Sequence, residues 1–137
     1  MKRILILLAI IISCKAEKVN EKDYTQDIKS LLTRSEQLAS NKKMEDARKN
    51  INKAIKLSTE HKNDIEIANC LFTLSKLEFK YGVPQIAELS FEKAKETYKS
   101  KNLKEKIKEI NAFGLELYKH LGKEDKVNEI IDNPYSK

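Results

Sequence analysis

The sequence predicts an all-α protein built from stacked antiparallel helix hairpins, and three observations lead to this fold class. Apolar residues recur at helical spacing along most of the chain. Residues that break helices are scarce, with 3 Gly and 2 Pro among 137 residues. A pattern of small and large apolar residues then returns after 40 residues, which is typical of a helical repeat protein.

The first unit contains two predicted helices, separated by the polar segment SNKK at 40–43. Within each helix the apolar residues fall three or four positions apart, so that they share one face. That face needs a partner in order to leave water. The apolar positions are Ile28, Leu31, Leu32 and Leu38 in the first helix, and Met44, Ala47, Ile51, Ala54 and Ile55 in the second.

The second and third units repeat this arrangement, with turns at YGVP (81–84) and LGKE (121–124). Gly82 and Gly122 are expected to take the left-handed conformation that closes a helix. Pro84 suits the first turn of the next helix, and Asn133-Pro134 ends the last one. The apolar positions are Ala68, Leu71, Phe72, Leu74, Phe79, Ala87, Phe91, Ala94 and Tyr98 in the second unit, and Ile107, Ile110, Phe113, Leu117, Leu121, Val127, Ile130 and Ile131 in the third.

Small residues at fixed positions on the second helices explain why the hairpins would stack. Alanines let neighbouring backbones approach closely, and one large residue between them fills the remaining space. A single hairpin cannot bury its own apolar face, so neighbouring hairpins cover it. The pattern is Ala47-x-x-x-Ile51-x-x-Ala54 in the first unit and Ala87-x-x-x-Phe91-x-x-Ala94 in the second, with Val127-x-x-x-Ile131 as a weaker third copy.

This pattern resembles the tetratricopeptide-repeat family, whose second helix carries a small residue, a large apolar residue and an alanine at the same spacing. The resemblance covers residues 24–132, and the period of 40 exceeds the family's period of about 34. The first helices carry Leu and Ser where the family has a large aromatic residue and Gly. Val127 replaces Ala and Asn111 replaces Leu in the third unit, as expected of a capping unit. A plain helical bundle is the alternative fold.

The first residues look like an export signal. A positive head, Met1-Lys2-Arg3, precedes nine apolar residues at 4–12. In a helix this run would span about 14 Å at 1.5 Å per residue, against about 30 Å of membrane hydrocarbon. The run is therefore too short for a stable transmembrane helix.

The end of that run, Ile11-Ile12-Ser13-Cys14, resembles the lipobox of bacterial lipoproteins. The resemblance implies that residues 1–13 are a signal peptide and that Cys14 receives acyl chains such as palmitate. Residues 14–23 would then be a polar tether, 24–132 the helical domain and 133–137 a tail. The abundance of Lys, Ile and Asn indicates an AT-rich genome, as in spirochaetes. An ordinary signal peptide or a buried N-terminal helix is the alternative to lipidation.

The resemblance to tetratricopeptide repeats also implies a partner groove lined by the first helix of each unit. Within it, Phe72 and Phe79 between Lys76 and Lys80 would hold an extended acidic peptide. The alternative is that the phenylalanines belong to the core and the lysines are solvated. The candidate groove residues are Lys29, Leu32, Glu36, Asn69, Phe72, Lys76, Phe79, Lys80, Glu109, Ala112, Glu116, Lys119 and His120.

Other chemistry is not expected. The net charge is +6, but only three arginines contribute to it, so the basic residues indicate a solvated lysine surface and not nucleic-acid binding. His61 and His120 lack metal-ligand spacing, and no phosphate-binding loop or nucleophile motif occurs, so we expect no metal, cofactor or enzymatic activity. Cys70 lies in an apolar stretch, and we expect it to be a buried core residue.

The expected function is therefore a non-enzymatic protein–protein interaction module, a scaffold or envelope assembly factor. It would be lipid-anchored to a membrane of the cell envelope, outside the cytoplasm, with an unidentified protein or peptide as partner. One alternative is a surface-exposed helical lipoprotein that binds host or environmental ligands. Another is a structural lipoprotein without a functional groove.

Overall fold

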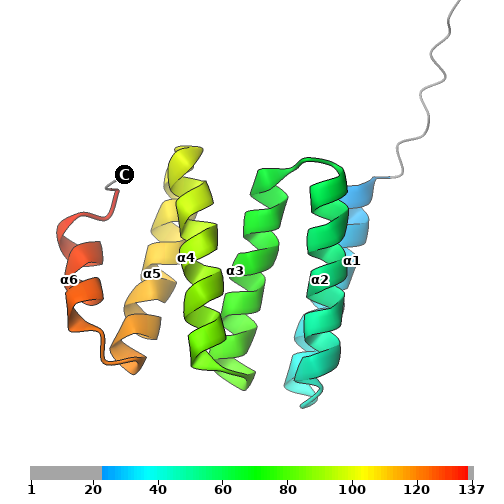
Figure 1. The fold of residues 1–137 in the computed structure, drawn as a ribbon, viewed down its shortest axis with the longest axis horizontal. Helices are drawn as coiled ribbons and strands as arrows, with labels where there is room; N and C mark the ends of the chain where they lie inside the picture. Colours follow the sequence, from blue (N-terminus) through cyan, green and yellow to red (C-terminus); the bar gives the residue numbers. More distant parts are fainter. Residues whose placement is uncertain (1–22, 136–137) are drawn as a thin grey trace, which may run out of the picture.

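The computed structural model describes residues 23–135, and this part of the chain forms six α-helices and no strand (Figure 1). The predicted all-α fold is confirmed, with helices in a regular period as expected of stacked hairpins. The predicted signal peptide and Cys14 lie outside the described residues. The helices are α1 (Tyr24–Ser40), α2 (Met44–Glu60), α3 (Asp64–Tyr81), α4 (Pro84–Ser100), α5 (Lys104–His120) and α6 (Glu124–Asp132).

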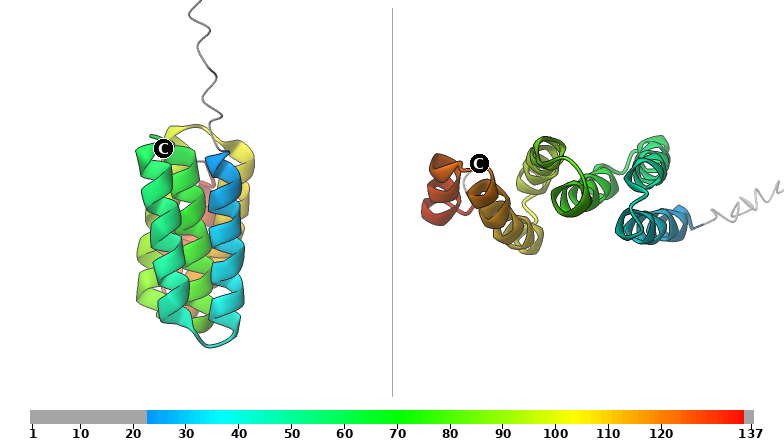
Figure 2. Two further views of the ribbon diagram at one scale, coloured as in Figure 1. Left: turned by 90° about the vertical axis from the view of Figure 1, so that its right-hand side faces the viewer. Right: turned by 90° about the horizontal axis from the view of Figure 1, so that it is seen from below.

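The helices run antiparallel and each packs on the next one along the chain. Seen along the helix axes, in the right panel of Figure 2, they follow one another in a zigzag. The first helices α1 and α3 also contact each other directly, and rings of α3 and α5 meet in the same way. One side of the molecule is therefore formed by the first helices, as the groove hypothesis requires.

Four of the five turns between helices close in the same way. In the first of them, the Lys43 N–H donates to the Leu38 carbonyl at 2.9 Å and the Lys42 N–H to the Ala39 carbonyl at 3.0 Å. This is the Schellman arrangement, which needs a residue with positive φ after the helix. The four residues with positive φ are Lys42 (61°), Lys62 (51°), Asn102 (53°) and Gly122 (68°), each 20 residues or a multiple of 20 from the others.

We expect Lys62→Gly to raise the free energy of unfolding by about 0.5–1 kcal/mol, because a left-handed conformation strains a side chain that has a Cβ. Urea unfolding followed by circular dichroism measures the change. The matched control is Lys53→Gly in the middle of α2, which should lose about 1 kcal/mol, since Gly weakens a helix interior. A loss of stability in Lys62→Gly would contradict the interpretation of these turns.

The turn at Gly82 differs, and the prediction of a left-handed Gly82 is wrong. Its φ is −131°, which is not left-handed. The physical reason for a glycine here is space, because an added Cβ would overlap Oε2 of Glu78. Pro84 begins α4, as predicted.

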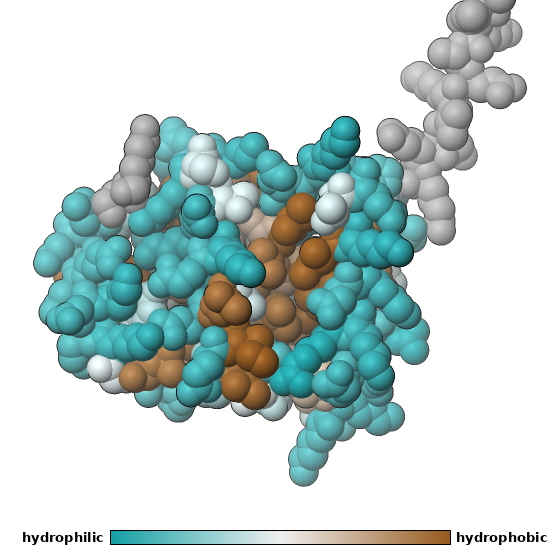
Figure 3. Space-filling view, viewed as in Figure 1, coloured by the Kyte–Doolittle hydropathy of each residue, from teal (hydrophilic) through white to brown (hydrophobic). Residues whose placement is uncertain are grey.

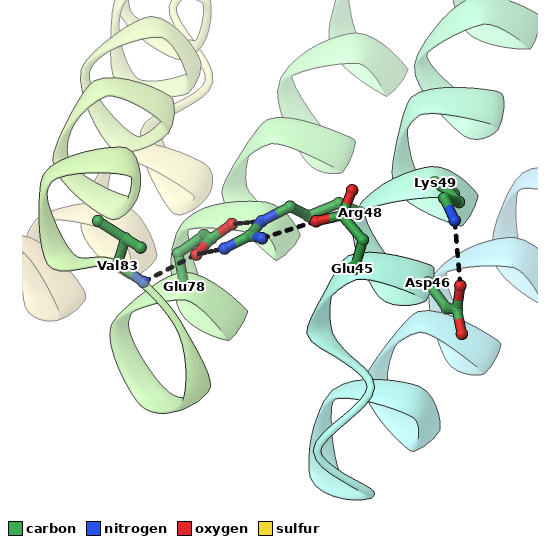
Figure 4. Close-up of polar contacts among 6 residues, drawn as sticks. All are labelled: Glu45, Asp46, Arg48, Lys49, Glu78 and Val83. Atoms are coloured by element: carbon green, nitrogen blue, oxygen red, sulfur yellow. Dashed lines mark hydrogen bonds and ion pairs between the residues drawn. The ribbon is translucent and has the colours of Figure 1, made fainter.

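Glu78 is fully buried and joins the first unit to the second (Figure 4). The Arg48 guanidinium of α2 donates to both carboxylate oxygens, with Nε at 2.5 Å from Oε1 and Nη2 at 3.0 Å from Oε2. The Val83 N–H donates to Oε2 at 2.9 Å. Burial by itself would raise the pKa of Glu78, but these hydrogen bonds and the Arg48 charge outweigh it and hold the pKa below its usual value.

The core confirms the predicted stacking pattern. All six residues of the two repeated motifs are 0% exposed. Cys70 is also buried, with its sulfur 3.9 Å from the Ser58 hydroxyl, and burial raises the pKa of its thiol to about 11. The first motif, formed by Ala47, Ile51 and Ala54, packs against α1 and α3 in one core cluster. The second motif, formed by Ala87, Phe91 and Ala94, packs against its neighbouring helices in the other core cluster.

The third unit departs from the repeat. Val127 is buried as predicted, but Ile131 is 60% exposed, and Ile130 takes the buried place instead. Gly114 of α5 allows this, since an added Cβ there would lie 3.0 Å from Cδ1 of Ile130. The final helix α6 has only 9 residues, whereas α2 and α4 have 17 each. The last hairpin is therefore incomplete along half of its length.

Candidate functional site

A groove lies between the first helices α1 and α3, with a volume of about 420 Å³. Four of the predicted groove residues line it, three from α1 and one from α3. The lining residues are Thr25, Gln26, Ile28, Lys29, Leu32, Thr33 and Glu36 of α1, and Glu66, Asn69 and Thr73 of α3.

The same repeat positions line the groove from both sides. Lys29 of α1 corresponds to Asn69 of α3 after 40 residues, and Thr33 corresponds to Thr73. Both helices begin at the same point of the repeat, so equivalent faces meet across the α1–α3 contact. Sequence reasoning named Lys29 and Asn69 but missed Thr33, Thr73 and Glu66. The 40-residue register itself was the signal that would have found them.

Asn69 is fixed in orientation by the second helix of its own unit. The Tyr98 hydroxyl of α4 donates to Asn69 Oδ1 at 2.7 Å. The Asn69 amide nitrogen has no hydrogen-bond acceptor within residues 23–135, and the residue lines the groove. Asn69 therefore offers the groove a positioned donor, of the kind that binds a peptide carbonyl or a carboxylate.

The remaining predicted aromatic residues join α3 to α5. The Phe72 and Phe79 rings each meet Phe113 edge-on, with centroids 5.6 Å apart, and the His120 ring lies 5.2 Å from Phe79. Phe72 is only 4% exposed and belongs to the core cluster, so it is not available to a partner. Phe79 is half-buried. For Phe72 the core interpretation is the correct one.

The lysines of α3 do not flank one common pocket. The Lys76 ammonium lies 4.7 Å from the centroid of the Phe72 ring, and the Lys80 ammonium lies 5.1 Å from that of Tyr81. Lys76 thus adds a positive charge over the α3–α5 aromatic contact, while Lys80 belongs to the turn end of α3. The other predicted positions, Glu109, Ala112, Glu116, Lys119 and His120, are exposed along α5 and do not line the groove between α1 and α3.

Figure 3 shows the opposite face, which carries α2 and α4, with apolar residues gathered over its middle. Four large apolar residues are exposed around the turn between α3 and α4: Tyr81 (39%), Val83 (40%), Ile86 (37%) and Leu89 (58%). This turn lies at the opposite end of the helices from the start of α1 (Figure 1).

Residues 23–135 contain no group of three or more His, Cys, Asp or Glu side chains placed to hold a metal ion. Over the same residues, none of the helices has the length and apolar character needed to cross a membrane. Comparison of the chain with protein-family models, with curated proteins and with solved structures finds no match.

Proposed function

We propose that this chain is a lipid-anchored, non-enzymatic interaction module that holds a protein partner in the groove between α1 and α3. The observation that carries the proposal is the convergence of Lys29, Glu36 and Asn69 from two helices on one groove. Repeat proteins built from stacked hairpins commonly bind partners along such extended surfaces.

The groove favours an extended peptide segment. Its floor includes the half-buried Leu32, which gives a segment apolar surface to cover. Lys29 and Asn69 supply donors for its carbonyl or carboxylate oxygens, and Glu36 supplies an acceptor. Such a mixture of apolar floor and polar rim is typical of protein interfaces.

The membrane half of the proposal rests on the lipobox-like sequence before Cys14. We expect Cys14→Ser to abolish incorporation of labelled palmitate and to release the chain from the membrane fraction, because two or more acyl chains hold firmly and none remain. Ser13→Ala is the matched control, since alanine is also a small residue, and it should retain the label. Unlabelled wild-type chain, or label that persists in Cys14→Ser, would contradict the anchor.

The groove half is tested by reversing charge on its own side of the molecule. We expect Lys29→Glu to remove partners that the wild type crosslinks in intact membranes, because Lys29 lines the groove. Lys53→Glu is the matched control, because this lysine is exposed on the second helix α2 and its substitution changes the net charge equally. Quantitative mass spectrometry of the crosslinked species measures the effect. Equal losses in both variants would show a general charge effect and contradict the groove.

A further inference from the structure

The helix α6, at the far end of the stack from α1, presents a face that is covered in the first two units (Figure 1). The large residue of the repeated motif is Ile51 in α2, Phe91 in α4 and Ile131 in α6. Ile51 shares a core cluster with Cys70 of the following first helix α3, and the Phe91 ring lies 5.4 Å from the Tyr118 ring of α5. Ile51 and Phe91 are 0% exposed, whereas Ile131 is 60% exposed, because none of the described helices follows α6.

A polar position of the repeat shows the same difference. On α4, Glu88 pairs with Lys123 at 2.6 Å and Glu92 accepts a hydrogen bond from the Tyr118 hydroxyl. Both partners belong to the following unit. After 40 residues, Glu92 corresponds to Asp132 of α6. Asp132 is exposed, and its side chain has no hydrogen bond or ion pair with another described residue.

The helix α6 is also acidic. It carries four carboxylates and one lysine, so its net charge is −3. The lysine pairs with Glu129 at 3.3 Å, which leaves Glu124, Asp125 and Asp132 without an ion pair among the described residues. Glu124 is seven residues before Ile131 and therefore lies on the same side of the helix, and Asp125 and Asp132 follow one edge of that side. The exposed face of α6 thus combines an apolar residue with unpaired acidic residues.

A second copy of the chain does not fit this face. Two α6 helices related by a two-fold axis would bring their acidic side chains together, which is unfavourable. In a head-to-tail stack α6 would meet the outer side of α1, which is polar where α3 has the core residues Cys70, Leu74 and Leu77. Such a contact would leave Ile131 without an apolar surface to pack on. The equivalent residues of α1, all exposed, are Ser30, Arg34 and Gln37.

We propose that the exposed face of α6 binds an amphipathic helix of a partner protein, in which Lys or Arg residues flank the apolar stripe. The partner helix packs on α6 as α3 packs on α2 and as α5 packs on α4. Its apolar stripe covers Ile131, and its basic side chains pair with Glu124, Asp125 and Asp132. This face is separate from the groove between α1 and α3 and does not depend on the partner proposed there.

Titration of the full-length chain with synthetic helical peptides, followed by amide NMR signals, tests the proposal. Each peptide has 18 residues, the length of α3. The first has a leucine stripe at helical spacing with lysine elsewhere, the second has the same stripe with glutamate, and the third has the composition of the first without a stripe. We expect saturable shifts centred on Asn128, Ile131 and Asp132 with the Leu–Lys peptide, and binding of the other two that is weaker by roughly tenfold or more.

Two substitutions with matched controls locate the site. Ile131→Ser should weaken binding of the Leu–Lys peptide roughly tenfold, because it removes apolar surface from the contact. Leu89→Ser on α4, where Leu89 is 58% exposed, should bind this peptide as the wild type does. Asp132→Asn should also weaken binding, whereas Glu60→Gln, at an exposed residue of α2, should not.

Several results would overturn the proposal. One is the absence of saturable shifts in the wild type, and another is equal affinity of Ile131→Ser and the wild type for the Leu–Lys peptide. Binding of the Leu–Glu peptide as tightly as the Leu–Lys peptide would contradict the role of the acidic residues. Self-association of the wild type that Ile131→Ser abolishes, measured by analytical ultracentrifugation, would show that a second copy covers the face. Unchanged circular dichroism of Ile131→Ser shows that any loss of binding is not a loss of fold.

Discussion

Glu78→Ala should lower the free energy of unfolding by about 1–3 kcal/mol, because it removes the buried acceptor of the Arg48 guanidinium, which then keeps only the exposed Glu45 as its partner. The carboxylate is 0% exposed and accepts three hydrogen bonds from two segments, α2 and the turn before α4. Removing it also leaves the Val83 N–H without its acceptor. Urea unfolding of the wild type and variant measures the difference.

An exposed ion pair on α2, the helix that carries Arg48, is the control for that variant. The Lys49 ammonium lies 3.4 Å from an Asp46 oxygen, and both side chains are more than half exposed. Lys49→Ala should therefore cost less than about 1 kcal/mol. A comparable loss in both variants would contradict the special role of the buried pair between the units.

The lowered pKa of Glu78 predicts how the free energy of unfolding depends on pH. The pKa of Glu78 is lower in the folded chain than its usual value, so its contribution is complete above the pKa of the unfolded chain. That contribution is lost as the pH falls through the lower folded-state pKa. The stability difference between the wild type and Glu78→Gln should thus shrink below about pH 4. A difference that stays constant down to the acid transition would contradict the assignment.

Phe91→Ala should cost about 3–5 kcal/mol, as expected for a large aromatic residue removed from a packed core. Phe91 is 0% exposed, and its ring meets Tyr118 at 5.4 Å and Phe113 at 6.2 Å between centroids. It therefore holds α4 against α5. Thermal and urea unfolding of the variant give the loss of stability.

Leu89→Ala is the control for Phe91→Ala, two residues away on the same helix and 58% exposed. It should change stability by less than about 0.5 kcal/mol, since surface substitutions outside special features have little effect. If the two variants lose similar stability, α4 does not pack through the face that the repeated motif predicts.

The helical pattern and the repeat were predictable because they are local. Helical spacing identifies an apolar face, and the 40-residue register aligns equivalent faces of successive units. The alanines around Ile51 and Phe91 had to be buried for the hairpins to stack, and they are. The candidate groove positions followed from the resemblance to tetratricopeptide repeats, and four of them, Lys29, Leu32, Glu36 and Asn69, line the groove between α1 and α3.

The features that were missed depend on contacts between distant residues. The first helix of a middle unit is covered on several sides, so its periodicity does not separate a core residue such as Phe72 from a groove residue. Glu78 and Arg48 are 30 residues apart, and no local sequence pattern predicts that they form an ion pair. The need for a glycine at Gly82 follows from that pair and not from backbone conformation.

The central claim is that the face formed by the first helices binds a protein partner. Site-specific photo-crosslinking in membranes tests this claim most directly. The full-length chain would carry a photoreactive residue either at Thr33, which lines the groove, or at Thr59, which is exposed on α2 outside it. We predict a discrete crosslinked species from Thr33 that is absent from Thr59. The same species from both positions, or none from Thr33, would contradict the account.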